Sequence, residues 1–274
     1  MTRLADYASA RELTINLTLR ELRGKYKRSV LGWTWSLINP LATVLIYSLV
    51  FAFFLKIQPP VGHPSGLHNF ALFLLCGLLP WNFVSGAMTE SMGALLGNGN
   101  LIKKVYFPRE VLIVATVAAL LVSFLIELGV LMVILLAFGN MVVPWIPALL
   151  VLVAIQTVFV LGIGLVLSVA NVYFRDMRHL IAILLQALFY TAPIVYPIRL
   201  VPKEATVFGH EIALRYVYEL NPLVRFLTAY RDVLYDLRFP AVGDVAYLVA
   251  WAAASLAIGL WVFSRLDGRL AEEV

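Results

Sequence analysis

Charged residues and cysteine are scarce in this chain of 274 residues. Asp, Glu, Lys and Arg make up 14% of it and hydrophobic residues 62%, whereas about a quarter of a typical soluble domain is charged. Too little polar surface remains to cover a water-soluble globule, which excludes a soluble enzyme and a disordered chain. The single cysteine, Cys76, excludes an internal disulfide and a zinc site built on two or more cysteines.

Motifs for nucleotide binding and catalysis are also missing. The pair Gly24-Lys25 is followed by Tyr26 and has no upstream glycine at the required spacing, so the chain contains no P-loop for ATP phosphates. Neither Gly-x-Ser-x-Gly nor His-Glu-x-x-His occurs, and the four histidines lack metal-ligand spacing. We therefore expect no catalytic residue, no metal and no cofactor in this chain.

Long apolar segments are the main positive feature. About 20 apolar residues cross the hydrocarbon core of a bilayer, and six segments are long enough: 33–55, 70–89, 111–138, 142–173, 180–198 and 245–264. Pro193 and Pro197 disturb the last turns of the fifth segment. The pattern predicts an all-α integral membrane protein whose six transmembrane helices occupy residues 33–266.

The placement of basic residues predicts the orientation, because Lys and Arg are enriched in cytoplasmic loops. The N-terminal segment, the loops after the second and fourth spans and the C-terminal tail 267–274 lie on one side and carry most of them, whereas the opposite short loops contain only Lys56. Both termini are therefore expected in the cytoplasm. The net charge of +5 then reflects loops that face anionic membrane lipids, with no nucleic acid involved. The charged first 32 residues and the length of the first apolar run argue against a cleavable signal peptide.

The segment 199–242 departs from this charge rule. It lies outside in the predicted topology, yet it contains six basic residues and the apolar stretch 220–234, which Asn221-Pro222 interrupts. It is too long for a simple connector. We predict one or two short re-entrant helices that dip into the outer leaflet; the alternative is an amphipathic hairpin at the surface.

Residues 1–32 predict a cytoplasmic amphipathic helix, centred on 4–26, that lies in the membrane interface. At helical spacing, its apolar face carries Ile15, Leu19, Leu22 and Tyr26, and the adjoining polar face carries Asn16, Arg20, Arg23 and Lys27. Glu127 is the one carboxylate inside a span. It raises two hypotheses, a role in proton coupling or a hydrogen bond that only stabilises the bundle.

Several short motifs occur in an order that resembles one family. They lie at 23–35, followed by Asn39-Pro40, and then at 77–81, 101–108, 171–176, 193–197 and Asn221-Pro222. The set is similar to the membrane subunit of type-2 ATP-binding-cassette exporters of polysaccharides, such as O-antigen, teichoic acid and galactan exporters.

The resemblance implies a complex in the bacterial inner membrane. This chain would pair with a second copy of itself and with two copies of a separate ATPase subunit, which would bind ATP and Mg. The substrate would be a lipid-linked glycan. The missing P-loop agrees with this division of labour. A type-2 exporter of a small drug or lipid is the alternative, and a membrane-embedded glycosyltransferase or lipid phosphatase is a more distant one.

The cytoplasmic loops supply the predicted contacts with the ATPase subunit. The resemblance places a coupling helix in the segment 98–110, where aromatic side chains can anchor in a groove of the partner. The predicted contact residues are Lys103, Lys104, Tyr106, Phe107, Arg109, Arg175 and Asp176.

Three further groups of residues complete the predicted site. Basic residues of the N-terminal helix can hold the pyrophosphate of the lipid carrier or bind ordinary phospholipid; they are Arg20, Arg23, Lys25 and Arg28. Aromatic residues of the first and fifth spans can line a channel for sugar rings or pack helices together; they are Tyr47, Phe51, Phe189, Tyr190 and Tyr196. Asn221 and Pro222 mark an outer gate.

Overall fold

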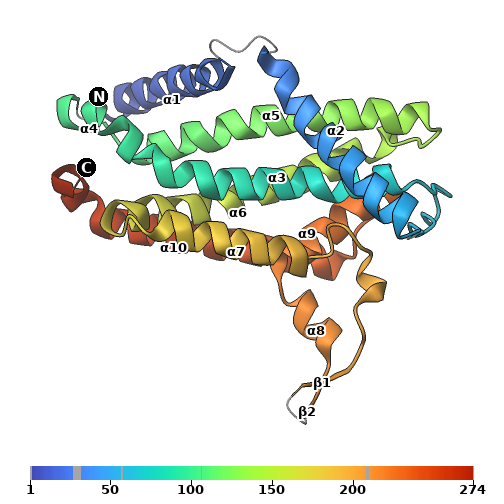
Figure 1. Ribbon diagram of the computed structural model, residues 1–274. Coiled ribbons are helices and arrows are strands. Elements are labelled where there is room, and N and C mark those ends of the chain that lie inside the picture. The colour runs from blue at the N-terminus through green and yellow to red at the C-terminus, as the bar shows by residue number, and fades with distance from the viewer. Residues whose placement is uncertain (1, 27–31, 57, 106, 208–209, 274) are drawn as a thin grey trace.

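The computed structural model describes residues 2–26, 32–56, 58–105, 107–207 and 210–273, and helices dominate these ranges (Figure 1). In chain order the elements are α1 (Thr2–Tyr26), η1 (Gly32–Thr34), α2 (Trp35–Tyr47), η2 (Ser48–Phe54), α3 (Phe70–Ala94), η3 (Leu96–Asn98), α4 (Gly99–Lys104), α5 (Glu110–Ala137), η4 (Val143–Trp145), α6 (Ile146–Tyr173), α7 (Met177–Thr191), η5 (Ile198–Leu200), β1 (Ala205–Val207), β2 (His210–Ile212), α8 (Leu214–Glu219), α9 (Pro222–Arg231), η6 (Asp232–Asp236) and α10 (Val242–Glu273). The strands β1 and β2 form a small antiparallel hairpin, which the sequence did not predict.

Four helices are long and apolar enough to cross a membrane. They cover Phe70–Ala94, Glu110–Ala137, Val143–Tyr173 and Val242–Asp267, which confirms four of the six predicted segments as helices of membrane length. The other two segments form shorter apolar helices, Ile38–Phe54 and Met177–Thr191. The chain is therefore a multi-pass membrane protein.

The fifth predicted segment forms a shorter helix than expected. α7 ends at Thr191, so its 15 residues rise about 22 Å, less than the roughly 30 Å of a hydrocarbon core. The next residue, Ala192, is extended because a residue before proline disfavours the helical conformation. The prediction of a helix to residue 198 was therefore wrong.

The long helices lie side by side, with α4 and both chain ends at one end of the bundle (Figure 1). We call this the α4 end. α8 and the β1–β2 hairpin project away from the bundle (Figure 1). α3 lies at the centre and packs against α5 and α6, while α6 also packs along α10.

The segment 199–242 contains the short helices that the sequence predicted. α9 is buried along most of its length and packs against α3, α6 and α10. Its start has the expected capping chemistry: the Asn221 side chain accepts a hydrogen bond of 2.9 Å from the Leu223 N–H, and Pro222 occupies the first turn. α9 therefore belongs to the helix bundle and does not lie on its surface.

α1 forms the predicted N-terminal helix and packs along α5. Leu13 and Leu17 contact the hydrophobic core and Leu22 is buried, whereas Ile15 and Leu19 of the predicted apolar face stay exposed. The helix thus has two apolar sides, one that meets α5 and one that is available to lipid.

Glycines allow α6 and α10 to touch backbone to backbone. A Cβ on Gly162 would lie 2.3 Å from the Ser255 carbonyl carbon, and a Cβ on Gly259 would lie 2.4 Å from the Gly162 carbonyl oxygen. Small residues at such contacts let membrane helices approach closely.

We expect Gly162→Ala to destabilise the protein by about 1–3 kcal/mol, because the added methyl group overpacks the contact between α6 and α10. The matched control is Gly129→Ala in α5, where a Cβ would meet nothing within 4 Å. Thermal unfolding in detergent measures both. Equal unfolding temperatures for the two variants would contradict this account of the contact.

Candidate functional site

The α4 end presents only part of the predicted partner surface. Lys103 and Lys104 are exposed in the last turn of α4, and Phe107 is half-buried against the core. Tyr106 lies outside the described residues. The Arg109 side chain turns inward: its Nη1 lies 3.0 Å from Asp267 Oδ1, and it also donates to the Asp267 carbonyl. Arg109 therefore joins the start of α5 to α10, and its charge is neutralised within the chain.

The turn between α6 and α7 lies at the same end. The Asn171 side chain donates a hydrogen bond of 2.7 Å to the Met92 carbonyl, which ties the last turns of α6 and α3 together. Arg175 and Asp176 follow directly and are exposed. The two predicted contact loops thus share one end of the bundle.

A cavity of about 640 Å3 opens at this end between α1, α3 and α7. Arg20 lines it and is held by Asn98 Oδ1 at 2.6 Å and by Glu21 at 2.8 Å. Arg178 of α7, which the sequence analysis did not single out, lines it as well; its Nη2 lies 3.0 Å from where a Gly93 Cβ would stand. Glu90 is also on the wall. Two guanidinium groups, which can pair with an anion, therefore face one space together with the carboxylates of Glu21 and Glu90.

The other predicted pyrophosphate ligands are not brought to this cavity. Arg23 is exposed and is absent from the cavity wall. The Lys25 side chain and the whole of Arg28 lie outside the described part of the chain.

Four of the five predicted channel aromatics come together in one cluster. The Phe189 ring of α7 stacks on Tyr47 at 6.0 Å and meets Trp81 at 5.9 Å and Tyr190 at 5.3 Å between ring centroids. Phe51 extends the cluster from Tyr47, with a centroid distance of 5.9 Å. Within one chain these contacts join α2, η2, α3 and α7, which is the helix-packing alternative. Tyr190 stays 64% exposed and can meet a ligand.

Tyr196, the fifth predicted channel aromatic, lies at the broken end of α7. Its hydroxyl donates to the Tyr190 or Thr191 carbonyl, at 3.1 and 3.0 Å, and lies 3.2 Å from the Tyr218 hydroxyl of α8. It therefore links the end of α7 to α8.

Arg231 is buried where α9 meets α3, and sequence reasoning missed it. Only 7% of the residue is exposed. Its guanidinium donates to the carbonyls of Pro193 and Ile194 and lies 3.8 Å from the centroid of the Phe73 ring. A Cβ on Gly77 would stand 2.7 Å from Arg231 Nη2, so a larger residue at this position would force the guanidinium to shift. Two features of the sequence could have pointed to this contact: Gly77 in the second predicted span, and Pro193 and Pro197 in the last turns of the fifth.

Two acidic residues of the segment 199–242, Asp232 and Asp236, form ion pairs with Arg238. Arg238 Nε donates to Asp232 Oδ1 at 2.8 Å, and its Nη2 lies 3.5 Å from Asp236 Oδ2. The hydrogen bond to Asp232 raises the pKa of Arg238 above the ordinary value of an arginine. The single Arg238 balances the charge of only one of these two carboxylates.

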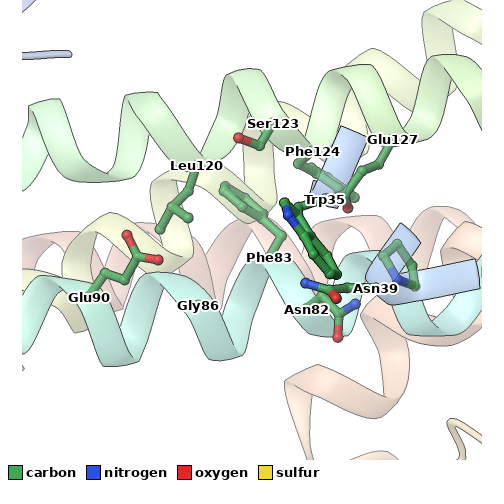
Figure 2. A pocket seen from close by; sticks show the side chains of 11 residues that line it. Trp35, Asn39, Asn82, Phe83, Gly86, Glu90, Leu120, Ser123, Phe124 and Glu127 are labelled. Carbon is green, nitrogen blue, oxygen red and sulfur yellow. The ribbon is translucent and has the colours of Figure 1, made fainter. Parts of the chain in front are cut away.

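A second cavity, of about 370 Å3, lies between α2, α3 and α5 (Figure 2). Glu127 of α5 and Asn82 of α3 line it, so the intramembrane carboxylate faces a polar space. The chain thus forms an apolar helix bundle with charged loops at one end and polar cavities along its helices. This is the arrangement of a multi-pass membrane protein of the transporter class.

Comparison with known proteins identifies the family. The pattern of the family described as ABC-2 type transporter matches residues 12–235, and the chain belongs to this family. It is 32% identical to the O-antigen export system permease protein RfbA of Myxococcus xanthus, over 96% of this chain and 94% of the relative. A Klebsiella pneumoniae protein of the same name is 27% identical, over 95% and 94%. The polysialic acid transport protein KpsM of Escherichia coli is 25% identical, over 90% of each.

We expect Arg231→Met to lower the free energy of unfolding by about 2–5 kcal/mol, because it removes hydrogen bonds from a charged group to two carbonyls. Arg231→Lys should recover part of this loss, since an ammonium group can still donate to one carbonyl. The control is Arg199→Met at an exposed position. Thermal unfolding in detergent distinguishes them, and a stable Arg231→Met protein would show that the guanidinium does not hold the segment.

Proposed function

We propose that the chain is the transmembrane subunit of an ATP-driven exporter in the bacterial inner membrane. It moves a lipid-linked polysaccharide from the cytoplasmic to the outer face. One observation carries the proposal: the similarity to a permease named for O-antigen export extends over 96% of this chain at 32% identity. It therefore includes the loops and the outer segment as well as the apolar helices.

The proposed topology has six membrane crossings with both termini in the cytoplasm. α2 with η2 spans 20 residues, about 30 Å if fully helical, and α7 supplies the remaining short crossing. The α4 end is cytoplasmic, because the loops rich in Lys and Arg lie there. The segment containing α8 and α9 is re-entrant at the outer face, and the burial of α9 among the long helices supports this.

ATP hydrolysis takes place in separate subunits in this proposal. Two copies of an ATPase, each with bound ATP and Mg, contact two copies of this chain through the α4 end. Exposed Lys103, Lys104, Arg175 and Asp176 supply the charged contacts. The ion pair between Arg109 and Asp267 lets a force on this loop reach both α5 and α10.

The lipid pyrophosphate binds at the cavity lined by Arg20 and Arg178 in this proposal, because guanidinium groups pair with phosphate oxygens in a bidentate manner. ATP-driven movement of the α4 end then opens a path past Tyr190 toward the outer segment that starts at Asn221 and Pro222. The connection from Tyr196 to Tyr218 gives α7 a direct link to that segment.

Depletion of this protein in cells tests the function. Lipid-linked glycan should accumulate on the cytoplasmic leaflet, as measured by leaflet-specific labelling and mass spectrometry, and the mass would identify the sugar. An ATPase-deficient partner subunit should produce the same accumulation. Normal glycan on both leaflets would overturn the proposal and favour the exporter of a small drug or lipid.

The double charge reversal Lys103→Glu, Lys104→Glu should weaken binding of the ATPase subunit by about tenfold, because it turns two attractive surface charges into repulsive ones. Co-purification of the two subunits at low and high salt measures this effect. The matched control is Lys203→Glu, an exposed lysine of the outer segment. Unchanged co-purification in the double variant would remove α4 from the interface.

A further inference from the structure

The cavity between α2, α3 and α5 has no role in the mechanism above. It is elongated and runs along one side of α3 (Figure 2). Asn39 comes from α2, Asn82 from α3 and Ser123 from α5, so three separate helices bring polar side chains to the same space. No part of the predicted site includes these residues.

Because of where the cavity lies, its polar side chains destabilise the protein unless a ligand or water bonds to them. Asn82 is the middle residue of α3, about 18 Å from either helix end. It therefore lies near the centre of the bilayer in the proposed topology. Polar groups at that depth are expensive against lipid and mark pathways for polar substrates or ions.

Unused hydrogen-bonding groups line the cavity. Within the described ranges, no hydrogen bond engages the side-chain amide of Asn39 or of Asn82, and only their backbone carbonyls accept bonds. Each amide offers two N–H donors and one acceptor. The Ser123 hydroxyl donates to the Ala119 carbonyl, which leaves its oxygen able to accept from a ligand. The pattern of paired donors and acceptors matches a hydroxyl-rich ligand better than a metal ion or a fatty acyl chain.

Aromatic side chains accompany these polar groups. The Phe83 and Phe124 rings line the cavity, but they stack on each other at 4.8 Å between centroids and are 3% and 2% exposed, so they form an apolar wall and offer no free ring face. Trp35 of α2 reaches into the same space beside Asn39 and Asn82 (Figure 2) and is 42% exposed. An apolar ring face next to amide groups can bind the C–H face of a sugar while the amides bind its hydroxyls.

The cavity also adjoins the guanidinium site. Glu90 lies on the wall of this cavity and on that of the cavity lined by Arg20 and Arg178. A ligand with its phosphate at the two arginines can therefore extend along α3 toward Asn82.

We propose that the cavity between α2, α3 and α5 is a sugar-binding site that holds the saccharide next to the lipid phosphate before the polymer crosses the membrane. The inference rests on the proposed export function and adds a specificity site to it. Sugar contact comes from Asn39, Asn82 and Ser123, and ring stacking comes from Trp35.

Binding by the complete transporter in lipid nanodiscs tests the site. The two probes are a polyprenyl diphosphate that carries a short oligosaccharide, long enough to extend from the two arginines to Asn82, and the same polyprenyl diphosphate without sugar. The unaltered protein should bind the first more tightly. Asn82→Leu should weaken binding of the sugar-bearing probe by about tenfold, the loss of one or two hydrogen bonds, and should leave the sugar-free probe unaffected. The control is Gln186→Leu, an exposed amide of α7 away from the cavity, which should change neither affinity.

Three results would overturn the sugar site: equal affinity of the unaltered protein for both probes, no effect of Asn82→Leu, or an equal loss for both probes. Asn39→Leu on α2 repeats the test if Asn82→Leu does not fold. None of these results touches the export function itself, because depletion would still trap lipid-linked glycan on the cytoplasmic leaflet. Failure of the site and failure of the function are thus separate outcomes.

Discussion

The arrangement of the bundle around the end of α7 depends on how Arg231 satisfies the carbonyls of Pro193 and Ile194. Where α7 ends, the backbone leaves the helix, and its carbonyl groups lose their intrahelical partners. Inside a bilayer no water is at hand to replace them. A buried guanidinium with several donors is one of the few groups that can serve two carbonyls at once. Arg231 from α9 thus serves the carbonyls that follow α7, while the Tyr196 hydroxyl serves the last carbonyls of α7 itself.

This solution restricts the rest of the helix bundle. The guanidinium lies close against Gly77 of α3, and the Phe73 ring of α3 provides a face for its charge. A second set of buried bonds fixes α9 to α6: Tyr230 donates to Gln156 at 2.6 Å, and Gln156 donates to the Pro80 carbonyl at 2.9 Å. α9 is thus held against α3 at two positions, directly at Gly77 and through Gln156 of α6 at Pro80. Both positions lie in the motif 77–81, to which the sequence analysis assigned a family resemblance but no contact.

The sequence predicted the long helices well because hydropathy reports directly on transfer into lipid, and four segments emerged as helices of membrane length. It failed where tertiary contacts decide the outcome. The sequence suggests that Arg109 is an exposed charge, but its side chain turns inward and forms an ion pair with Asp267, which is distant in the chain. Arg178 was not singled out, since nothing in its local sequence shows that α7 places it against Gly93. Four of the five aromatic residues named from the first and fifth spans pack together, and spacing alone could not show that Trp81 would pack among them.

The distribution of polar groups in the bundle separates those that stabilise the fold from those available to a ligand. Gln156 and Arg231 are buried and donate to backbone carbonyls of neighbouring helices, so they are already engaged in the resting protein. Asn39 and Asn82 lie at the wall of an open cavity, and their amides have no such partners among the described residues. A membrane protein that only needed stability would place apolar side chains at these two positions, because unsatisfied amides at that depth destabilise it. Their position beside the exposed ring of Trp35 supports the proposed sugar site on the side of α3 that faces α5.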